Sequence, residues 1–296
     1  GYTFSRPDGR YDIAVNGGGE IVADYQKAGF LRAQRRVTTP WQDWVLMPDA
    51  ALVPLDSASS TIVFNATVDL QVHRASAISD SDGDRRATLL FPAGIRADMV
   101  ALDGSRTPVS ALTVRATEYT VGPNGPARMP AVLPATSGYT YAVELSADEA
   151  LQTGAKGIEF DRPVVLYYED YLGFPVGARI PVGYYDFRLG SWLPSPDGRV
   201  VKILGDANGL AALDIDGSGQ AADVAALAAL GIDEAERAKL LALYPIGQVL
   251  WRSAATHFTP WDCNFPFGPP PDAEPPQPPA DPPGEPDPPE DPTNPP

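Results

Sequence analysis

The sequence has little cysteine and histidine, with one cysteine, Cys263, and two histidines among 296 residues. A single cysteine excludes a disulfide within the chain, so the fold must depend on its hydrophobic cores. Cys263 has no recognisable base beside it in the sequence, and we expect a buried or inert thiol. A zinc cluster is excluded because it needs several cysteine or histidine ligands. No apolar run approaches the roughly 20 residues that span a bilayer, and no signal peptide opens the chain.

Basic residues are also scarce. The chain has 22 Lys and Arg against 38 Asp and Glu, which gives a net charge of -16. Nucleic acids and anionic membranes require clustered cations, so this balance argues against both as partners. The acidic surface is compatible with divalent cations.

Much of the acid lies in a proline-rich end. Residues 269–296 contain seven acidic side chains and no basic one, and they contribute many of the 33 prolines. Such a composition cannot bury enough apolar surface to fold. We therefore expect residues 266–296 to be a disordered, acidic linker that acts as a semi-rigid spacer.

Most of the remaining chain alternates apolar and polar residues, which predicts β-strands. A first hairpin is expected at residues 11–25. The longest alternation, at residues 61–72, predicts one strand that leaves His73 exposed on its polar face. Short strands separated by Gly, Pro and Asp turns indicate a mainly β fold of tandem β-sandwich domains. We expect a partial sandwich at residues 1–57 and a second one at 58–265.

A helical pattern interrupts the second sandwich at about residues 205–246. The segment "AADVAALAALGIDEAERAKLLALY" is rich in alanine and leucine, with Gly231 as the C-cap of one helix. Asp233 and Glu236 have the spacing of a capping box that begins another. The sequence therefore predicts a small two-helix insertion. A shorter helical turn is expected in "SADEALQTGAK", with Ser146 as its N-cap.

The stretch "LDIDGSGQAAD", residues 213–223, precedes the first of these helices. Asp214, Asp216 and Ser218 occupy the first, third and fifth positions of an EF-hand-type calcium loop, with Gly219 at the sixth position where the loop turns sharply. Ala225 stands where such a loop has a bidentate Glu, so Asp223 would have to replace it. The predicted calcium ligands are Asp214, Asp216, Ser218, Gln220 and Asp223. The alternative is a polar turn that caps the helix, and in both cases the role is structural.

A second candidate for chemistry is "AATHFTPWDCN". It resembles the self-cleaving sequence of some nucleoporins, in which a hydroxyl attacks a strained peptide bond. Cleavage would then fall between Phe258 and Thr259, with Thr259 as nucleophile and His257 as base. Pro260 departs from that pattern, and similar strands end bacterial β-sandwiches that do not cleave. We expect no enzymatic activity.

Two resemblances suggest a larger context. Pro-Asp-Gly-Arg at residues 7–10 and the segment "YQKAGF" resemble the carboxypeptidase regulatory-like domain, a transthyretin-like β-sandwich, of which residues 1–57 would be a part. The strings "SGYTYAVELSADEA", "LGFPVGARIPVGYYD" and "LWRSAATHFTPWDCN" resemble the region upstream of the repeats in bacterial Rhs/YD-repeat proteins, which are polymorphic-toxin-like.

The Rhs resemblance implies a non-catalytic module of a secreted or cell-surface bacterial protein. Its partner would be a downstream Rhs repeat domain of the same polypeptide, whose shell it would space or cap, with calcium as a stabilising ion. Two alternatives stay open, namely the self-cleaving domain and a module that binds glycans or another cell-surface ligand.

Overall fold

The computed structural model describes residues 1–263, except for 66, 122–124, 135–137 and 139. Residues 1–266 form one compact unit. The predicted linker at 266–296 lies outside the described residues. The mainly β fold class is confirmed, because strands dominate the chain and the helices are few and short. A division between residues 57 and 58 stays a prediction.

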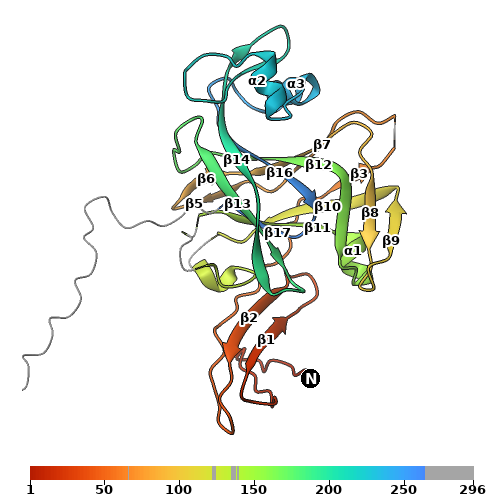
Figure 1. Ribbon diagram of the computed structural model, residues 1–296, viewed down its shortest axis with the longest axis vertical. Coiled ribbons are helices and arrows are strands. Elements are labelled where there is room, and N and C mark those ends of the chain that lie inside the picture. The colour runs from red at the N-terminus through yellow and green to blue at the C-terminus, as the bar shows by residue number, and fades with distance from the viewer. Residues whose placement is uncertain (66, 122–124, 135–137, 139, 264–296) are drawn as a thin grey trace, which may run out of the picture. The chain divides into compact units, whose positions relative to one another are not determined.

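Strands follow one another along most of the chain, with few helices between them (Figure 1). In chain order they are β1 Glu20–Tyr25, β2 Ala33–Thr38, β3 Ser60–Val63, β4 Gln71–Arg74, β5 Ile78–Asp80, β6 Gly83–Arg85, β7 Ala87–Phe91, β8 Ala97–Val100, β9 Arg106–Val109, β10 Ala111–Glu118, β11 Ala142–Ala147, β12 Gly157–Glu169, β13 Arg179–Asp186, β14 Ser191–Asp206, β15 Ala211–Asp214, β16 Val249–His257 and β17 Pro260–Asp262. The helices are α1 Asp148–Thr153, α2 Val224–Ala229 and α3 Glu234–Leu243, with a 3-10 turn at Gly125–Arg128.

Hydrogen bonds join 13 of these strands into one sheet in the order β3-β10-β11-β17-β13-β14-β16-β12-β7-β4, with β15 beside β14, β8 beside β12 and β9 beside β8. The two ends of this order meet through a side chain. The Gln71 amide accepts from the Val63 backbone N–H at 2.9 Å and donates to the Val63 carbonyl at 2.8 Å. The Gln71 side chain therefore takes the place of a strand partner for β3.

Two apolar clusters lie on opposite faces of β12. Val164, Leu166 and Tyr168 belong to the larger cluster, whereas Val165 and Tyr167 belong to the smaller one. This division follows from the pleat, because successive side chains of a strand point to opposite faces. Residues 164–168 of β12 are thus buried between the two clusters.

The helices α2 and α3 cover the smaller cluster, where the sequence predicts the insertion. Asp223 caps α2 by accepting from the Ala226 N–H at 2.7 Å. Asp233 caps α3 by accepting from the Glu236 N–H at 2.8 Å, as predicted. The Glu236 side chain does not complete the capping box. It is buried and accepts from Arg252 Nε at 2.7 Å and from the Tyr167 hydroxyl.

Other local predictions are wrong. Residues 11–15 form no strand, and the N-terminal hairpin consists of β1 and β2 instead. The N-cap of α1 is Ala147, the last residue of β11, and not Ser146. The alternation at 61–72 is divided between β3 and β4, which join different neighbours.

His73 is buried and not exposed as predicted. It packs on the inner side of β4, with its Nδ1 3.0 Å from the Ser60 hydroxyl. Burial lowers its pKa to about 4, so the ring is neutral at physiological pH.

Candidate functional site

A network of polar contacts between segments that are distant in sequence lies where the β1–β2 hairpin meets the rest of the folded unit. β1 and β2 pair antiparallel, with Asp24 opposite Gln34 and Ala23 opposite Arg35. The side chains of Gln34 and Arg35 therefore leave opposite faces of the hairpin. Gln34 contacts the end of β13 and the turn after it, and Arg35 contacts the segment 127–130 between β10 and β11.

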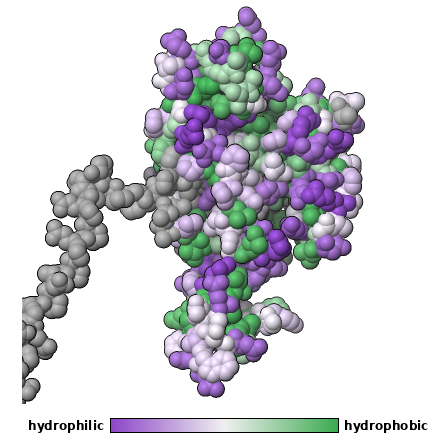
Figure 2. Space-filling view, in the orientation of Figure 1, coloured by the Kyte–Doolittle hydropathy of each residue, from purple (hydrophilic) through white to green (hydrophobic). Residues whose placement is uncertain are grey.

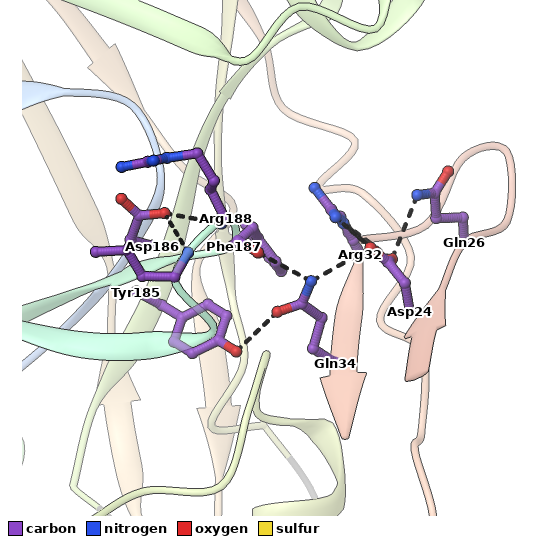
Figure 3. A network of polar contacts seen from close by, with 9 residues as sticks. Asp24, Gln26, Arg32, Gln34, Tyr185, Asp186, Phe187 and Arg188 are labelled. Carbon is purple, nitrogen blue, oxygen red and sulfur yellow. Dashed lines mark hydrogen bonds and ion pairs between the residues drawn. The ribbon is translucent and has the colours of Figure 1, made fainter. Parts of the chain in front are cut away.

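Gln34 contacts the turn that follows β13 (Figure 3). Its amide oxygen accepts from the Tyr185 hydroxyl at 2.8 Å, and its amide nitrogen donates to the Phe187 carbonyl at 3.1 Å. The same nitrogen donates to Asp24 at 3.3 Å. Gln34 is buried, so each of these polar atoms needs its partner.

Asp24 completes this network. It forms a bidentate ion pair with Arg32 and accepts from the Gln26 amide. Burial acts to raise the pKa of the Asp24 carboxyl, but the hydrogen bonds and charge of Arg32 outweigh it and leave the pKa below its usual value. Asp24 therefore stays ionised, and Arg32 in turn lies over the Phe187 ring.

Arg35 enters the sheet from the other face of the hairpin. Its side chain is buried and its guanidinium donates to backbone carbonyls rather than to a carboxylate. The acceptors are the carbonyls of Ala127 at 2.7 Å, Gln34 at 2.7 Å, Asp49 at 2.9 Å, Met129 at 3.1 Å and Pro130 at 3.4 Å. Burial lowers the pKa of Arg35, but an arginine remains charged in proteins. A buried cation thus fastens the hairpin to residues 127–130.

An apolar cluster fills the space beside Arg35. Leu31 and Val53 from the N-terminal segment pack against Ala142 of β11 and against Tyr119 and Met129 of the segment between β10 and β11. Backbone hydrogen bonds run through it, from Leu31 N–H to the Val53 carbonyl at 2.7 Å and from Gln34 N–H to the Pro130 carbonyl at 2.6 Å. Together with the polar contacts, this cluster makes residues 1–55 part of the same folded unit as the sheet.

A titratable carboxyl lies next to this cluster. Glu144 accepts from the Tyr119 hydroxyl at 2.7 Å. Burial raises the pKa of Glu144 to about 8, and the hydrogen bond from Tyr119 and the charge of Arg32 only partly oppose the shift. Glu144 is therefore mostly protonated at neutral pH.

The predicted calcium residues form a tight loop that lies apart from this region. Asp214 is buried, and its carboxylate accepts from the backbone N–H groups of Asp216 at 3.1 Å, Gly217 at 2.8 Å and Gly219 at 2.8 Å. A side chain on Gly217 would come within 2.6 Å of the Val176 carbonyl, so the loop packs closely on its neighbour.

The other predicted ligands have local partners. Asp216 accepts from the Ser218 N–H, the Ser218 hydroxyl accepts from the Gln220 N–H, and Asp223 caps α2. In the described part of the chain, no three His, Cys, Asp or Glu side chains are grouped so that they could hold a metal ion. Calcium binding by this loop stays a prediction.

The structure gives no support to self-cleavage. The Thr259 hydroxyl donates to the Tyr185 carbonyl at 2.6 Å. The His257 ring has the Thr256 hydroxyl 3.3 Å from its Nδ1. The two residues named as nucleophile and base are thus engaged with other groups.

The sequence did not predict the burial of Gln34 and Arg35, the two residues that attach the hairpin. The segment "LRAQRRV", residues 31–37, contains three arginines, and its pattern does not indicate that Arg35 is the buried one. The available signal is a glutamine and two arginines between the apolar positions Ala33 and Val37.

Comparisons with known proteins identify the N-terminal segment. A sequence model of the teneurin TTR-like domain matches residues 1–52. Teneurin-3 of Danio rerio is 40% identical over 47 residues, which is 16% of this chain and 2% of teneurin-3. The chain thus spans a very small part of the curated relative that it matches. No solved structure matches the chain.

These matches contradict the prediction of a bacterial Rhs-type protein. The N-terminal segment is similar to an animal teneurin, so the assignment to Rhs/YD-repeat or polymorphic-toxin-like proteins was wrong, as was the carboxypeptidase regulatory-like assignment. The predictions of a downstream Rhs repeat partner and of a role in spacing or capping its shell are therefore also wrong. The self-cleaving and glycan-binding alternatives gain no support. A non-enzymatic chain is consistent with the match to a TTR-like domain. Among the described residues, no helix is both long and apolar enough to cross a membrane.

Proposed function

We propose that the chain is a non-catalytic structural module of a teneurin-type protein, which holds its TTR-like segment in a fixed orientation against the large β-sheet. The match of residues 1–52 to the teneurin TTR-like domain supports the context. The proposal includes a location at the cell surface, which the teneurin relative also supports.

The observation that carries the proposal is the buried position of Arg35 among backbone carbonyls. A flexible tether between two independent parts does not need a desolvated cation, because burying a charge is costly unless its hydrogen bonds are satisfied. Arg35 reaches residues 127–130, more than 90 positions away in the sequence. Gln34 reaches Tyr185 and Phe187 from the opposite face of the same strand. Two such attachments on two faces restrain the hairpin in orientation as well as in position.

A double-mutant cycle tests this attachment in solution. Gln34→Ala and Tyr185→Phe each remove one side of the same hydrogen bond, so their effects on the free energy of unfolding should not add. We expect a coupling energy of about 0.5 to 1.5 kcal/mol, typical of one buried hydrogen bond.

The matched control pairs Gln34→Ala with Tyr171→Phe, whose hydroxyl donates to the Thr140 carbonyl at 2.8 Å and has no contact with Gln34. This pair should be additive. A coupling of zero between Gln34 and Tyr185 would mean that the hairpin is not docked in solution, and the proposed function would be abandoned.

A further inference from the structure

A groove of about 500 Å³ lies where β14 and β16 pass the end of α2. Three of the residues that line it are arginines, namely Arg179, Arg199 and Arg252. Hydrophilic residues are scattered over the visible face of the molecule (Figure 2), but the chain as a whole has a net charge of -16. A cluster of three cations is an exception in so acidic a chain.

The pairing of the strands places the three arginines in one row. Arg179 of β13 lies opposite Arg199 of β14, and Arg199 lies opposite Arg252 of β16. Residues that lie opposite each other share a face, so all three side chains leave the same side of the sheet. Like charges in such positions destabilise the strand pair, and the row therefore favours a counter-charge.

Arg252 has its counter-charge within the fold. Its guanidinium pairs with Glu236 and donates to the carbonyls of Leu230 at 2.9 Å and Gly231 at 3.4 Å. These contacts fasten the end of α2 to β16. The charge of Arg252 is thus already used by the protein.

The other two arginines have no carboxylate within hydrogen-bonding distance among the described residues. Arg199 donates to the Gly177 carbonyl at 2.8 Å and forms no ion pair there, so it uses few of its five N–H donors. Arg179 Nη1 lies 3.9 Å from Asp197 Oδ2, which is too far for a hydrogen bond. Both members of that pair are exposed to solvent. Two neighbouring guanidiniums therefore have donors to spare at the groove.

We propose that the groove binds an organic phosphate or sulfate ester, whose oxyanion lies between Arg179 and Arg199. The guanidinium fork matches such groups by two parallel hydrogen bonds. A phosphate or sulfate ester has three terminal oxygens, enough for two guanidiniums, whereas one fork occupies both oxygens of a carboxylate. The hydroxyls of Ser195 and Thr256 belong to residues of the same lining and supply further donors.

The rest of the lining fits the apolar part of an ester. Its apolar members are Pro163, Pro196, Ala229, Leu230 and Ala254. The volume lies within the roughly 300 to 1,000 Å³ of small-molecule sites, and an inorganic ion would fill little of it. An organic ester uses both the cationic and the apolar residues of the groove.

Isothermal titration calorimetry of the full chain with phenyl phosphate tests the proposal. Arg199→Gln should weaken binding roughly 10- to 100-fold, because it removes charge-assisted hydrogen bonds. Arg179→Gln should weaken binding about 2- to 5-fold, as expected of a more exposed charge. Asp197→Asn removes the carboxylate that competes for Arg179 and should strengthen binding by about the same factor. Arg179 and Asp197 are exposed, so their variants keep the test valid even if Arg199→Gln does not fold.

Arg106→Gln is the matched control. It removes the same charge from an arginine that pairs with Glu159 outside the groove, and the affinity should not change. Phenyl sulfate in a parallel titration distinguishes the two kinds of ester, and binding of either one supports the proposal. Benzoate and inorganic phosphate should bind more weakly than the better ester, and phenol should not bind.

Three results would overturn the proposal. The first is that neither ester binds. The second is that Arg106→Gln weakens binding as much as Arg179→Gln, because the ester would then respond only to net charge. The third is that phenol binds as tightly as phenyl phosphate. None of them bears on the Gln34–Tyr185 coupling, so this proposal can fail while the proposed function stands.

Discussion

Replacing Arg35 by methionine should detach the hairpin from the sheet. The substitution keeps an unbranched side chain of similar length but removes every hydrogen bond that the guanidinium donates. The carbonyls of Ala127 and Pro130 keep backbone N–H partners, whereas the buried Met129 carbonyl accepts its hydrogen bond from the Arg35 guanidinium. An unsatisfied buried polar group costs about 1 to 3 kcal/mol, and further charge-assisted bonds are lost. We expect the free energy of unfolding to fall by about 2 to 4 kcal/mol.

The neighbouring arginine provides the control. Arg36 donates to Glu20 and to the Gly190 carbonyl, both at 2.8 Å, but its side chain is 43% exposed. Arg36→Met should therefore cost less than about 1 kcal/mol, as for other exposed ion pairs.

Urea unfolding measures both variants, because the linear extrapolation gives the free energy directly. Hydrogen exchange of the β2 amides shows whether the loss is local to the hairpin or global. The reasoning is refuted if Arg35→Met is no more destabilising than Arg36→Met in both measurements.

Four further predictions follow from other parts of the chain. Because burial raises the pKa of Glu144 from 4.5 to about 8, the folded state binds its proton more tightly, and stability should fall as the pH rises from about 4.5 to 8. The free energy of unfolding should fall by less than about 1.4 kcal/mol per pH unit. Urea unfolding at several pH values should show a smaller dependence on pH in Glu144→Gln. If the predicted loop binds calcium, the melting temperature should be higher in calcium than in chelator. At a calcium concentration 100 times the dissociation constant, the free energy of unfolding should rise by about 2.7 kcal/mol, and Asp214→Ala should remove the difference. Glu236→Ala leaves Arg252 buried without its carboxylate and should cost about 3 to 5 kcal/mol in chemical unfolding. Burial raises the pKa of the Cys263 thiol, so thiol reagents should modify it only after unfolding, as mass spectrometry can follow.

Local signals in the sequence predicted the N-caps of α2 and α3 and the place of the helical insertion. The caps Asp223 and Asp233 bind backbone groups three residues ahead, so their partners are visible in the same short stretch. The change from a strand pattern to a helical one placed the insertion correctly for the same reason. The alternation at 61–72 failed because a period of two does not distinguish one strand from two strands joined by a turn.

The candidate site depends on partners far away in the chain. Gln34 and Tyr185 are 151 positions apart, and Arg35 and Met129 are 94 apart. No periodicity in "LRAQRRV" reports such contacts, so the burial of these polar side chains could not be predicted. The burial of His73 escaped prediction because the end of β4 had been assigned to a longer strand.

The central claim, that the TTR-like segment is fixed against the sheet, is tested most directly by a distance measurement. Spin labels on Lys27→Cys in the β1–β2 turn and Thr107→Cys in β9 occupy exposed positions, and the buried Cys263 should not react. The labelled chain is diluted with unlabelled copies, so that only pairs of labels within one molecule contribute to the double electron–electron resonance signal. A single narrow distance distribution that broadens in Arg35→Met is the predicted result. A broad distribution in the unsubstituted background, unchanged by Arg35→Met, would contradict the account.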